Sequence, residues 1–297
     1  MRGIPERFAG VASDAVVEGH ADAQAVLLAR PGASARMVVV YHGGGNDRFF
    51  GLGFLFDRLL DAGFAVLTGN MAGHGQGGSD LFDVAGARER VDALLAAARA
   101  HAAAGAHAAA GAHEAAEAQG AEGAGVTVLG QSMGGAFGLD QLARGVGPAR
   151  VVTVSAPLSL RQGTDFLMEL GCLGSAAVRT AVRYEGLFRA LPAYRSFRRG
   201  AFPVRTAAGK HYLDAFAEAL DELSLEARLA NAAGLVPRAL IVHGERDGVV
   251  PVQQAHRLAS ALGAAAELRV LPGMHHLDPL LDRDTVRGVV EWIASAA

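Results

Sequence analysis

Cysteine and lysine are almost absent from this chain of 297 residues. Cys172 is its single cysteine and Lys210 its single lysine. A single cysteine cannot form an internal disulfide, so the sequence predicts a protein of a reducing compartment, and we expect a cytoplasmic one. At this length a chain buries enough apolar surface to fold without a disulfide or a structural metal. The scarcity of cysteine therefore excludes a small, disulfide-stapled fold.

The sequence also lacks an excess of positive charge and a long apolar run. Its formal net charge is −3, which gives no electrostatic footprint for nucleic acid. Residues 1–8 (MRGIPERF) lack the apolar stretch of a secretory signal. The longest tract of small residues is rich in alanine, which is too weakly hydrophobic and too often interrupted to span a bilayer. We expect no nucleic-acid partner and no membrane span.

The remaining pattern alternates between strands and helices. Apolar, β-branched runs predict strands at residues 37–41, 64–68, 126–129, 151–154, 239–242 and 267–271. Amphipathic stretches predict helices at residues 50–62, 84–100, 132–143, 252–262 and 285–296. Two short extended stretches, at residues 15–18 and 25–29, predict a hairpin at a sheet edge. This alternation indicates an α/β fold with a mostly parallel central sheet and helices on both faces.

Two segments interrupt the alternation. Residues 93–125 contain a six-residue alanine-rich repeat that carries His101, His107 and His113. On a helix, six residues turn successive histidines about 120° apart, so the repeat does not predict a metal site. Residues 158–236 are too long for a structureless loop, and they predict a helical lid or cap insertion. The expected division is a core at 1–157, a lid at 158–236 and the rest of the core at 237–297.

The sharpest chemical signal is GQSMG at residues 130–134, which stands between a predicted strand and a predicted helix. This context is typical of a nucleophile elbow, in which a tight turn exposes a serine above the sheet. The turn needs small residues two positions before and after Ser132, and Gly130 and Gly134 stand there. A serine hydroxyl is a weak nucleophile, so it needs an adjacent base and a group that orients this base. A glycine-rich turn without a chemical role is the alternative interpretation.

Four further motifs stand at the ends of predicted strands. They are HGGG at 42–45, GNMAGHG at 69–75, HGERDGVVP at 243–251 and GMHHL at 273–277. With GQSMG, their order resembles the α/β-hydrolase superfamily over about residues 35–157 and 237–297. The triple glycine is similar to the lipase and esterase branch related to hormone-sensitive lipase. The G-H-G loop and the late helical insertion resemble the monoglyceride-lipase and serine-aminopeptidase type.

The resemblance implies a catalytic triad with Ser132 as nucleophile. The acid is expected just after the strand at 239–242, where Asp247 is the candidate and Glu245 competes with it. The base is expected in the last of these loops, three residues after a glycine, which selects His276 over its neighbour His275.

The resemblance also implies an oxyanion hole of backbone N–H groups. Its expected donors are the amides of Met133 and Gly44, with Gly45 as a further candidate. His42 and His74 are interpreted as residues that organise their loops. Asn70 stands where the family commonly has an aspartate, and we interpret this difference as structural because neither group belongs to the triad.

These features predict a serine hydrolase that cleaves a carboxylic ester of a small acyl substrate through an acyl-enzyme intermediate. No metal and no organic cofactor is implied. A thioesterase or an acyltransferase would use the same triad. A C–C hydrolase, a cofactor-free lyase or isomerase, and a non-catalytic hydrolase-like binding protein are further alternatives on this fold.

The predicted lid contains a basic stretch. Its eight basic residues, against the single acid Glu185, are Arg179, Arg183, Arg189, Arg195, Arg198, Arg199, Arg205 and Lys210. Such a stretch would attract an anionic substrate or an acidic carrier protein. Solvated helix faces in a sequence that uses arginine for nearly all of its basic residues are the other interpretation.

Overall fold

An eight-stranded sheet forms the centre of the computed structural model, which describes residues 4–20, 23–33, 36–45, 47–75, 80–118, 125–160, 204–207, 210, 212–232 and 238–295. The strand order is β1-β2-β4-β3-β5-β6-β7-β8. The strands are β1 (Ala12–Asp14), β2 (Val26–Leu28), β3 (Met37–Tyr41), β4 (Ala65–Thr68), β5 (Val126–Gln131), β6 (Arg150–Val154), β7 (Ala239–Gly244) and β8 (Ala266–Leu271).

The sheet is parallel from β4 to β8, and only β1 and β2 add antiparallel pairs at one edge. This topology confirms the predicted α/β fold. The expected edge hairpin is present, but its first strand is β1 rather than residues 15–18, because the pairing register joins Ala12 to Leu28 and Asp14 to Val26. Val16 lies outside this pairing with 90% of its side chain exposed, whereas Val17 packs into the core.

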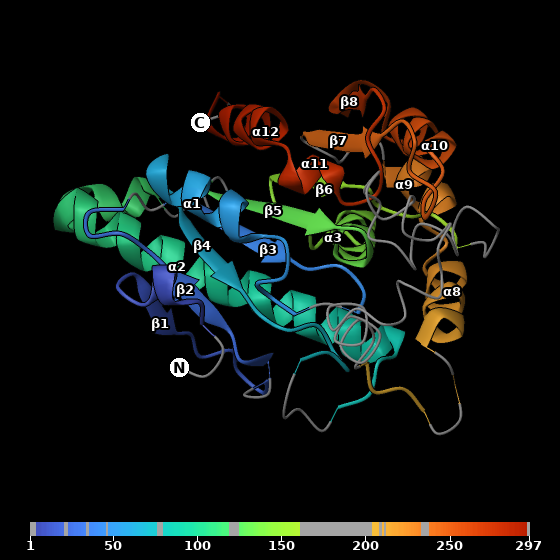
Figure 1. Cartoon of the computed structure of the whole chain (residues 1–297). Coiled ribbons are helices and arrows are strands. Elements are labelled where there is room, and N and C mark those ends of the chain that lie inside the picture. The colour runs from blue at the N-terminus through green and yellow to red at the C-terminus, as the bar shows by residue number, and fades with distance from the viewer. Residues whose placement is uncertain are drawn as a thin grey trace.

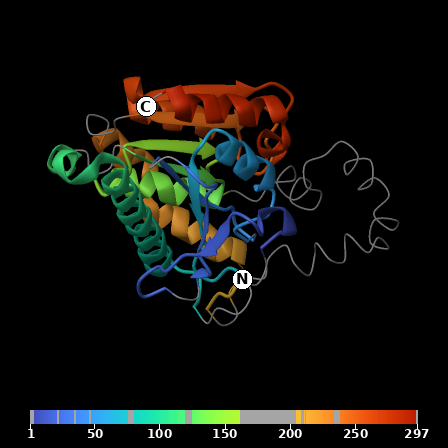
Figure 2. The same cartoon turned by 90° about the vertical axis from the view of Figure 1, so that its left-hand side faces the viewer.

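Helices cover both faces of the sheet (Figure 1, Figure 2). One face carries α1 (Gly53–Asp61), α11 (Asp278–Leu281) and α12 (Arg283–Ser295). The other carries α2 (Val84–Ala118), α3 (Met133–Ala143), α8 (Tyr212–Leu223), α9 (Leu225–Ala232) and α10 (Gln253–Leu262). Short 3-10 turns lie at Glu6–Phe8 (η1) and Gly263–Ala265 (η5).

Strand β3 illustrates why the sequences of the central strands are continuous apolar runs. All five of its residues are buried, since the sheet is covered on both sides. Val38 and Val40 pack with the α1, α11 and α12 layer, while Met37, Val39 and Tyr41 pack with the opposite layer. A strand with two buried faces has no polar alternation, as is usual in parallel sheets.

The two predicted interruptions differ in how far the structure describes them. Helix α2 continues past residue 100 through the alanine-rich repeat to Ala118, since alanine has the highest helix propensity. The side chains of His107 and His113 lie outside the described residues, as does the segment 161–203 of the predicted lid. Helices α8 and α9 bury Phe216, Leu220 and Leu229 in the main core cluster. None of the helices in the described part of the chain is long and apolar enough to cross a membrane.

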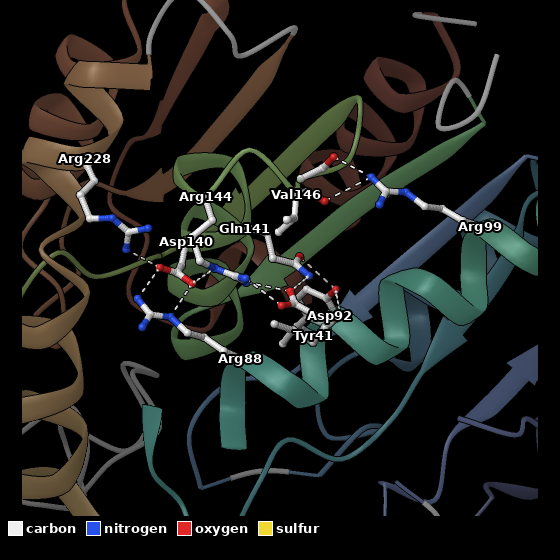
Figure 3. Close-up of polar contacts among 11 residues, drawn as sticks. Tyr41, Arg88, Asp92, Arg99, Asp140, Gln141, Arg144, Val146 and Arg228 are labelled. Atoms are coloured by element: carbon white, nitrogen blue, oxygen red, sulfur yellow. Dashed lines mark hydrogen bonds and ion pairs between the residues drawn. The ribbon is translucent and has the colours of Figure 1, made fainter. Parts of the chain in front are cut away.

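A buried carboxylate joins three of the helices (Figure 3). Asp140 on α3 is fully buried and accepts hydrogen bonds from Arg88 of α2, from Arg144 just after the end of α3 and from Arg228 of α9, with N···O distances of 2.6–2.9 Å. Arg144 continues the network with two hydrogen bonds of 2.7 Å to Asp92 of α2. The charged cluster thus ties α2 and α9 to α3, the helix that starts at the predicted nucleophile.

Candidate active site

Ser132 lies between β5, which ends at Gln131, and α3, which begins at Met133. Its backbone has φ 49° and ψ −118°, a conformation that residues other than glycine rarely adopt. The turn brings backbone very close on both sides. A Cβ on Gly130 would lie 2.4 Å from the carbonyl oxygen of Gly134, and a Cβ on Gly134 would lie 2.4 Å from that of Tyr41. The two glycines of the motif are therefore required by contacts of the backbone.

Three predicted residues come together at the carboxyl ends of β5, β7 and β8. The hydroxyl of Ser132 lies 3.1 Å from Nε2 of His276, and Nδ1 of His276 lies 2.8 Å from Oδ2 of Asp247. The carboxylate accepts the Nδ1 proton, which leaves Nε2 to accept the proton of the serine. All three side chains are largely buried.

The turn after β7 orients Asp247. Its Oδ1 accepts the backbone N–H groups of Val249 at 3.0 Å and Val250 at 2.7 Å. Nε2 of His243 lies 3.3 Å from the other oxygen. Burial alone would raise the pKa of Asp247, but the charge of His276 and hydrogen bonds from His243 and His276 outweigh it and hold this pKa well below its usual range. Asp247 is therefore a carboxylate at neutral pH.

Glu245 and His275, the competing candidates for the acid and the base, form hydrogen bonds within the same two loops. Glu245 accepts the backbone N–H of Gly273 at 2.9 Å, and the backbone N–H of His275 donates to Asp278 at 2.8 Å. The loops after β7 and β8 also approach each other closely, because a Cβ on Gly244 would lie 2.4 Å from the carbonyl oxygen of Met274. These contacts fix the distance between Asp247 and the loop that carries the imidazole.

His42 and His74 organise the loops after β3 and β4, as expected. The N–H of Met71 donates to Nε2 of His42 at 2.9 Å, and the N–H of Gly45 donates to Nε2 of His74 at 3.2 Å. The opposite ring nitrogens donate to the carbonyls of Gly43 and Ala72. Burial lowers the pKa of His42 to about 4 and that of His74 to about 3, so both rings are neutral acceptors near neutral pH.

The remaining loop residues also have structural partners. Asn70 accepts the backbone N–H of Arg48 at 3.2 Å and donates to Gln24 at 3.2 Å. Arg205, one of the eight basic residues of the predicted lid, pairs with Asp80 at 3.3 Å. Lys210, a second member of that set, pairs with Glu218, and the other six lie outside the described residues.

Met133 and Gly44, the residues of two candidate oxyanion donors, both lie against one tyrosine. Met133 is the first residue of α3, so its N–H has no acceptor within the helix. Its sulfur accepts a hydrogen bond from the hydroxyl of Tyr212 at 3.2 Å. A Cβ on Gly44 would lie 2.0 Å from that same hydroxyl oxygen. Gly45 differs from these two, because its N–H is engaged by His74.

Sequence reasoning missed two residues that contact the site. Tyr212 reaches it from α8, and Ser155 donates its hydroxyl to the carbonyl oxygen of His276 at 3.0 Å. Ser155 follows β6 directly and has φ 54°. Neither residue belongs to a local motif, and an apolar strand followed by a serine is the only signal that points to Ser155. Among the described residues, no group of three or more His, Cys, Asp or Glu side chains is arranged to hold a metal ion.

Known proteins share this architecture. The monoacylglycerol lipase of Paleococcus ferrophilus is 18% identical, with a TM-score of 0.58 over 88% of this chain and 95% of that one. The 2-hydroxy-6-oxo-6-phenylhexa-2,4-dienoate hydrolase of Rhodococcus sp. strain RHA1 is 18% identical, with a TM-score of 0.57 over 91% of this chain and 94% of that one. A soluble variant of the Saccharomyces cerevisiae monoglyceride lipase is 16% identical, with a TM-score of 0.59 over 92% of both chains.

A search among curated proteins found no match. The family model of the S33 serine aminopeptidases, in contrast, matches residues 32–283, a span that includes every candidate triad and oxyanion residue. The match covers most of the chain and agrees with the parallel sheet, its helical layers and the elbow. The chain therefore belongs to the S33 serine aminopeptidase family of α/β-hydrolases.

Proposed function

We propose that this hydrolase cleaves a carboxylic ester with Ser132 as nucleophile, His276 as general base and Asp247 as the acid that orients the imidazole. The observation that carries the proposal is the chain of contacts from Ser132 Oγ to His276 Nε2 at 3.1 Å and from His276 Nδ1 to Asp247 Oδ2 at 2.8 Å. A nucleophile, a base and an orienting acid within hydrogen-bond reach are what acyl transfer by serine requires.

The reaction runs in two halves. Ser132 Oγ attacks the ester carbonyl while its proton passes to His276 Nε2, and the tetrahedral intermediate then expels the alcohol, which takes the proton from the imidazole. Water attacks the resulting acyl-enzyme with His276 again as base. Asp247 stays ionised throughout and stabilises the imidazolium that forms in each half.

The oxyanion hole in this proposal consists of the N–H groups of Met133 and Gly44. Negative charge develops on the carbonyl oxygen in each tetrahedral intermediate, and a backbone N–H that is already oriented stabilises it at no cost of reorganisation. Removal of one such donor typically costs about 3 kcal/mol of transition-state stabilisation. Gly45 contributes by holding the loop through its hydrogen bond to His74.

An ester as substrate is supported by the kinds of protein that share the fold, which include two monoacylglycerol or monoglyceride lipases and an esterase of Exiguobacterium antarcticum. A thioesterase or an acyltransferase is the alternative with the same triad. Within the expected basic stretch, Arg205 and Lys210 form ion pairs with residues of this chain, so these two side chains give no support to an acidic carrier protein.

A fluorophosphonate probe tests the nucleophile, because it reacts covalently with an activated serine. We expect the probe to label the wild type and not the Ser132→Ala variant, and we expect hydrolysis of p-nitrophenyl esters to fall by about 10⁶-fold in that variant. Measurement of kcat/KM over p-nitrophenyl esters and acyl thioesters of increasing chain length then separates an esterase from a thioesterase. Equal labelling of both proteins would overturn the proposal.

A further inference from the structure

Tyr212 brings a hydroxyl group to the candidate oxyanion hole from a distant part of the chain. It is the first residue of α8, and only 5% of it is exposed. Its hydroxyl donates to Met133 Sδ at 3.2 Å, and Gly44 leaves room for it, since a Cβ there would lie 2.0 Å from the oxygen. The hydroxyl thus contacts both residues whose amides are the proposed oxyanion donors.

The ring of Tyr212 is fixed by aromatic neighbours on three sides. It stacks on Phe216 with an interplanar angle of 4° and a centroid distance of 5.9 Å. His74 and Phe82 meet it edge to face, each at 5.5 Å. His74 in turn accepts the N–H of Gly45, so the ring, the glycine loop and α8 are packed as one unit. A ring held in this way keeps its oxygen in place, so only the O–H bond has to rotate during a reaction, and such preorganisation is the condition for effective transition-state stabilisation.

The chemistry of the hydroxyl suits a donor. Burial raises the pKa of Tyr212, so the phenol keeps its proton at neutral pH. The thioether sulfur of Met133, which accepts a hydrogen bond from this hydroxyl, is a weak acceptor. A negatively charged oxygen is a far stronger acceptor, because hydrogen bonds to ionised groups are shorter and about twice as strong as neutral ones.

We propose that Tyr212 is a catalytic residue whose hydroxyl donates a third hydrogen bond to the oxyanion, beside the N–H groups of Met133 and Gly44. This inference rests on the proposed serine-hydrolase function and deepens it. In the tetrahedral intermediate the hydroxyl exchanges the sulfur of Met133 for the anionic oxygen. Position 44 then requires glycine for a second reason besides close approach of the backbone to the substrate, because a side chain there would displace the hydroxyl of Tyr212.

The Tyr212→Phe variant tests the hydroxyl, since it keeps the packed ring. We expect kcat for a p-nitrophenyl ester to fall by about 10²-fold with little change in KM, as for loss of one oxyanion donor. Inhibition by a trifluoromethyl ketone, which forms a tetrahedral adduct with a serine, should weaken by a similar factor. The matched control is Tyr41→Phe, which removes a buried hydroxyl that bonds Val91 and Gln141, and it should leave kcat and inhibition unchanged.

A double-mutant cycle gives an independent readout. Gly44→Ala should displace the hydroxyl and lower kcat in the wild-type background. In the Tyr212→Phe background the new methyl group meets only the ring carbons Cζ and Cε1, at 3.0 and 3.2 Å, in place of the oxygen at 2.0 Å, and it should cost less. A Tyr212→Phe variant with wild-type kcat and wild-type inhibition, or additive effects in the cycle, would overturn the role of Tyr212. Absence of fluorophosphonate labelling in the wild type would instead overturn the proposed function itself.

Discussion

Ser132 is held in its strained backbone conformation by contacts of its own main chain. Its N–H donates to the carbonyl of Val154 at 2.8 Å, and its carbonyl accepts the N–H of Gly135 at 2.9 Å. A residue in such a sparsely populated region costs about 1–3 kcal/mol and persists only where its surroundings over-determine it. The conformation places Oγ within 3.1 Å of His276 Nε2, so the strained backbone positions the proposed nucleophile.

The isosteric substitution Asp247→Asn tests the role of the carboxylate in the proposed mechanism. Asp247→Asn keeps the acceptor for the N–H groups of Val249 and Val250, but an amide cannot hold the same imidazole tautomer. We expect kcat to fall by about 10⁴-fold, measured with a p-nitrophenyl ester. The matched control is Glu245→Gln, which removes the rival carboxylate while keeping an acceptor for Gly273. A large loss of kcat in Glu245→Gln together with a small loss in Asp247→Asn would make Glu245, and not Asp247, the group that orients the imidazole.

At the scale of elements, α3 connects the proposed nucleophile to helices α2 and α9. Arg228 of α9 reaches Asp140 of α3, and α8, which directly precedes α9, carries Tyr212. Burial would raise the pKa of Asp140, but hydrogen bonds from the three arginines outweigh it and lower this pKa. The ion pairs therefore stabilise the packing of α2, α3 and α9 above the unfolded carboxyl pKa of about 4, and this stabilisation is lost as the pH falls below it.

Removal of the central charge should loosen this packing. Asp140→Asn leaves three arginines around a buried amide, and loss of one partner from a buried ion pair typically costs about 3–5 kcal/mol. We expect the free energy of unfolding in urea at pH 7 to fall by about 3 kcal/mol. Asp61→Asn is the control, because its pair with Arg30 is exposed and should contribute less than about 0.5 kcal/mol. Equal losses in the two variants would contradict a structural role for the cluster.

The elements and the triad could be predicted from sequence because their signals are local. GQSMG lies within five residues, and Asp247 and His276 each follow an apolar strand by a few positions. Tyr212 and Arg228 could not be predicted, because their partners stand 79 and 88 residues away. Only the folded sheet, which gathers loops at the carboxyl ends of its strands, brings such pairs together. The hydrogen bond from the N–H of Gly45 to His74 likewise forms because the sheet brings the loops after β3 and β4 together.

At the scale of the whole molecule, two neutral histidines link the loops after β3 and β4 beside the site. The rings of His42 and His74 meet edge to face at 5.2 Å, between the loops after β3 and β4. A proton on Nε2 of either ring would place a charge in a buried space and would remove the acceptor for Met71 or Gly45. The folded state therefore resists protonation of both rings, whereas the unfolded chain does not.

This resistance makes stability depend on pH. Burial keeps the pKa of His42 at about 4 and of His74 at about 3, below the unfolded value of about 6.5. Between the folded and unfolded pKa values the unfolded state binds more protons, so the free energy of unfolding decreases as the pH is lowered, by about 1.4 kcal/mol per pH unit for each ring. The measurement is the free energy of unfolding in urea at pH 5.5 and at pH 4.5. Its dependence on pH should be about 1.4 kcal/mol per pH unit shallower in His74→Gln than in the wild type. A wild-type slope in His74→Gln would mean that its ring accepts a proton in the folded protein.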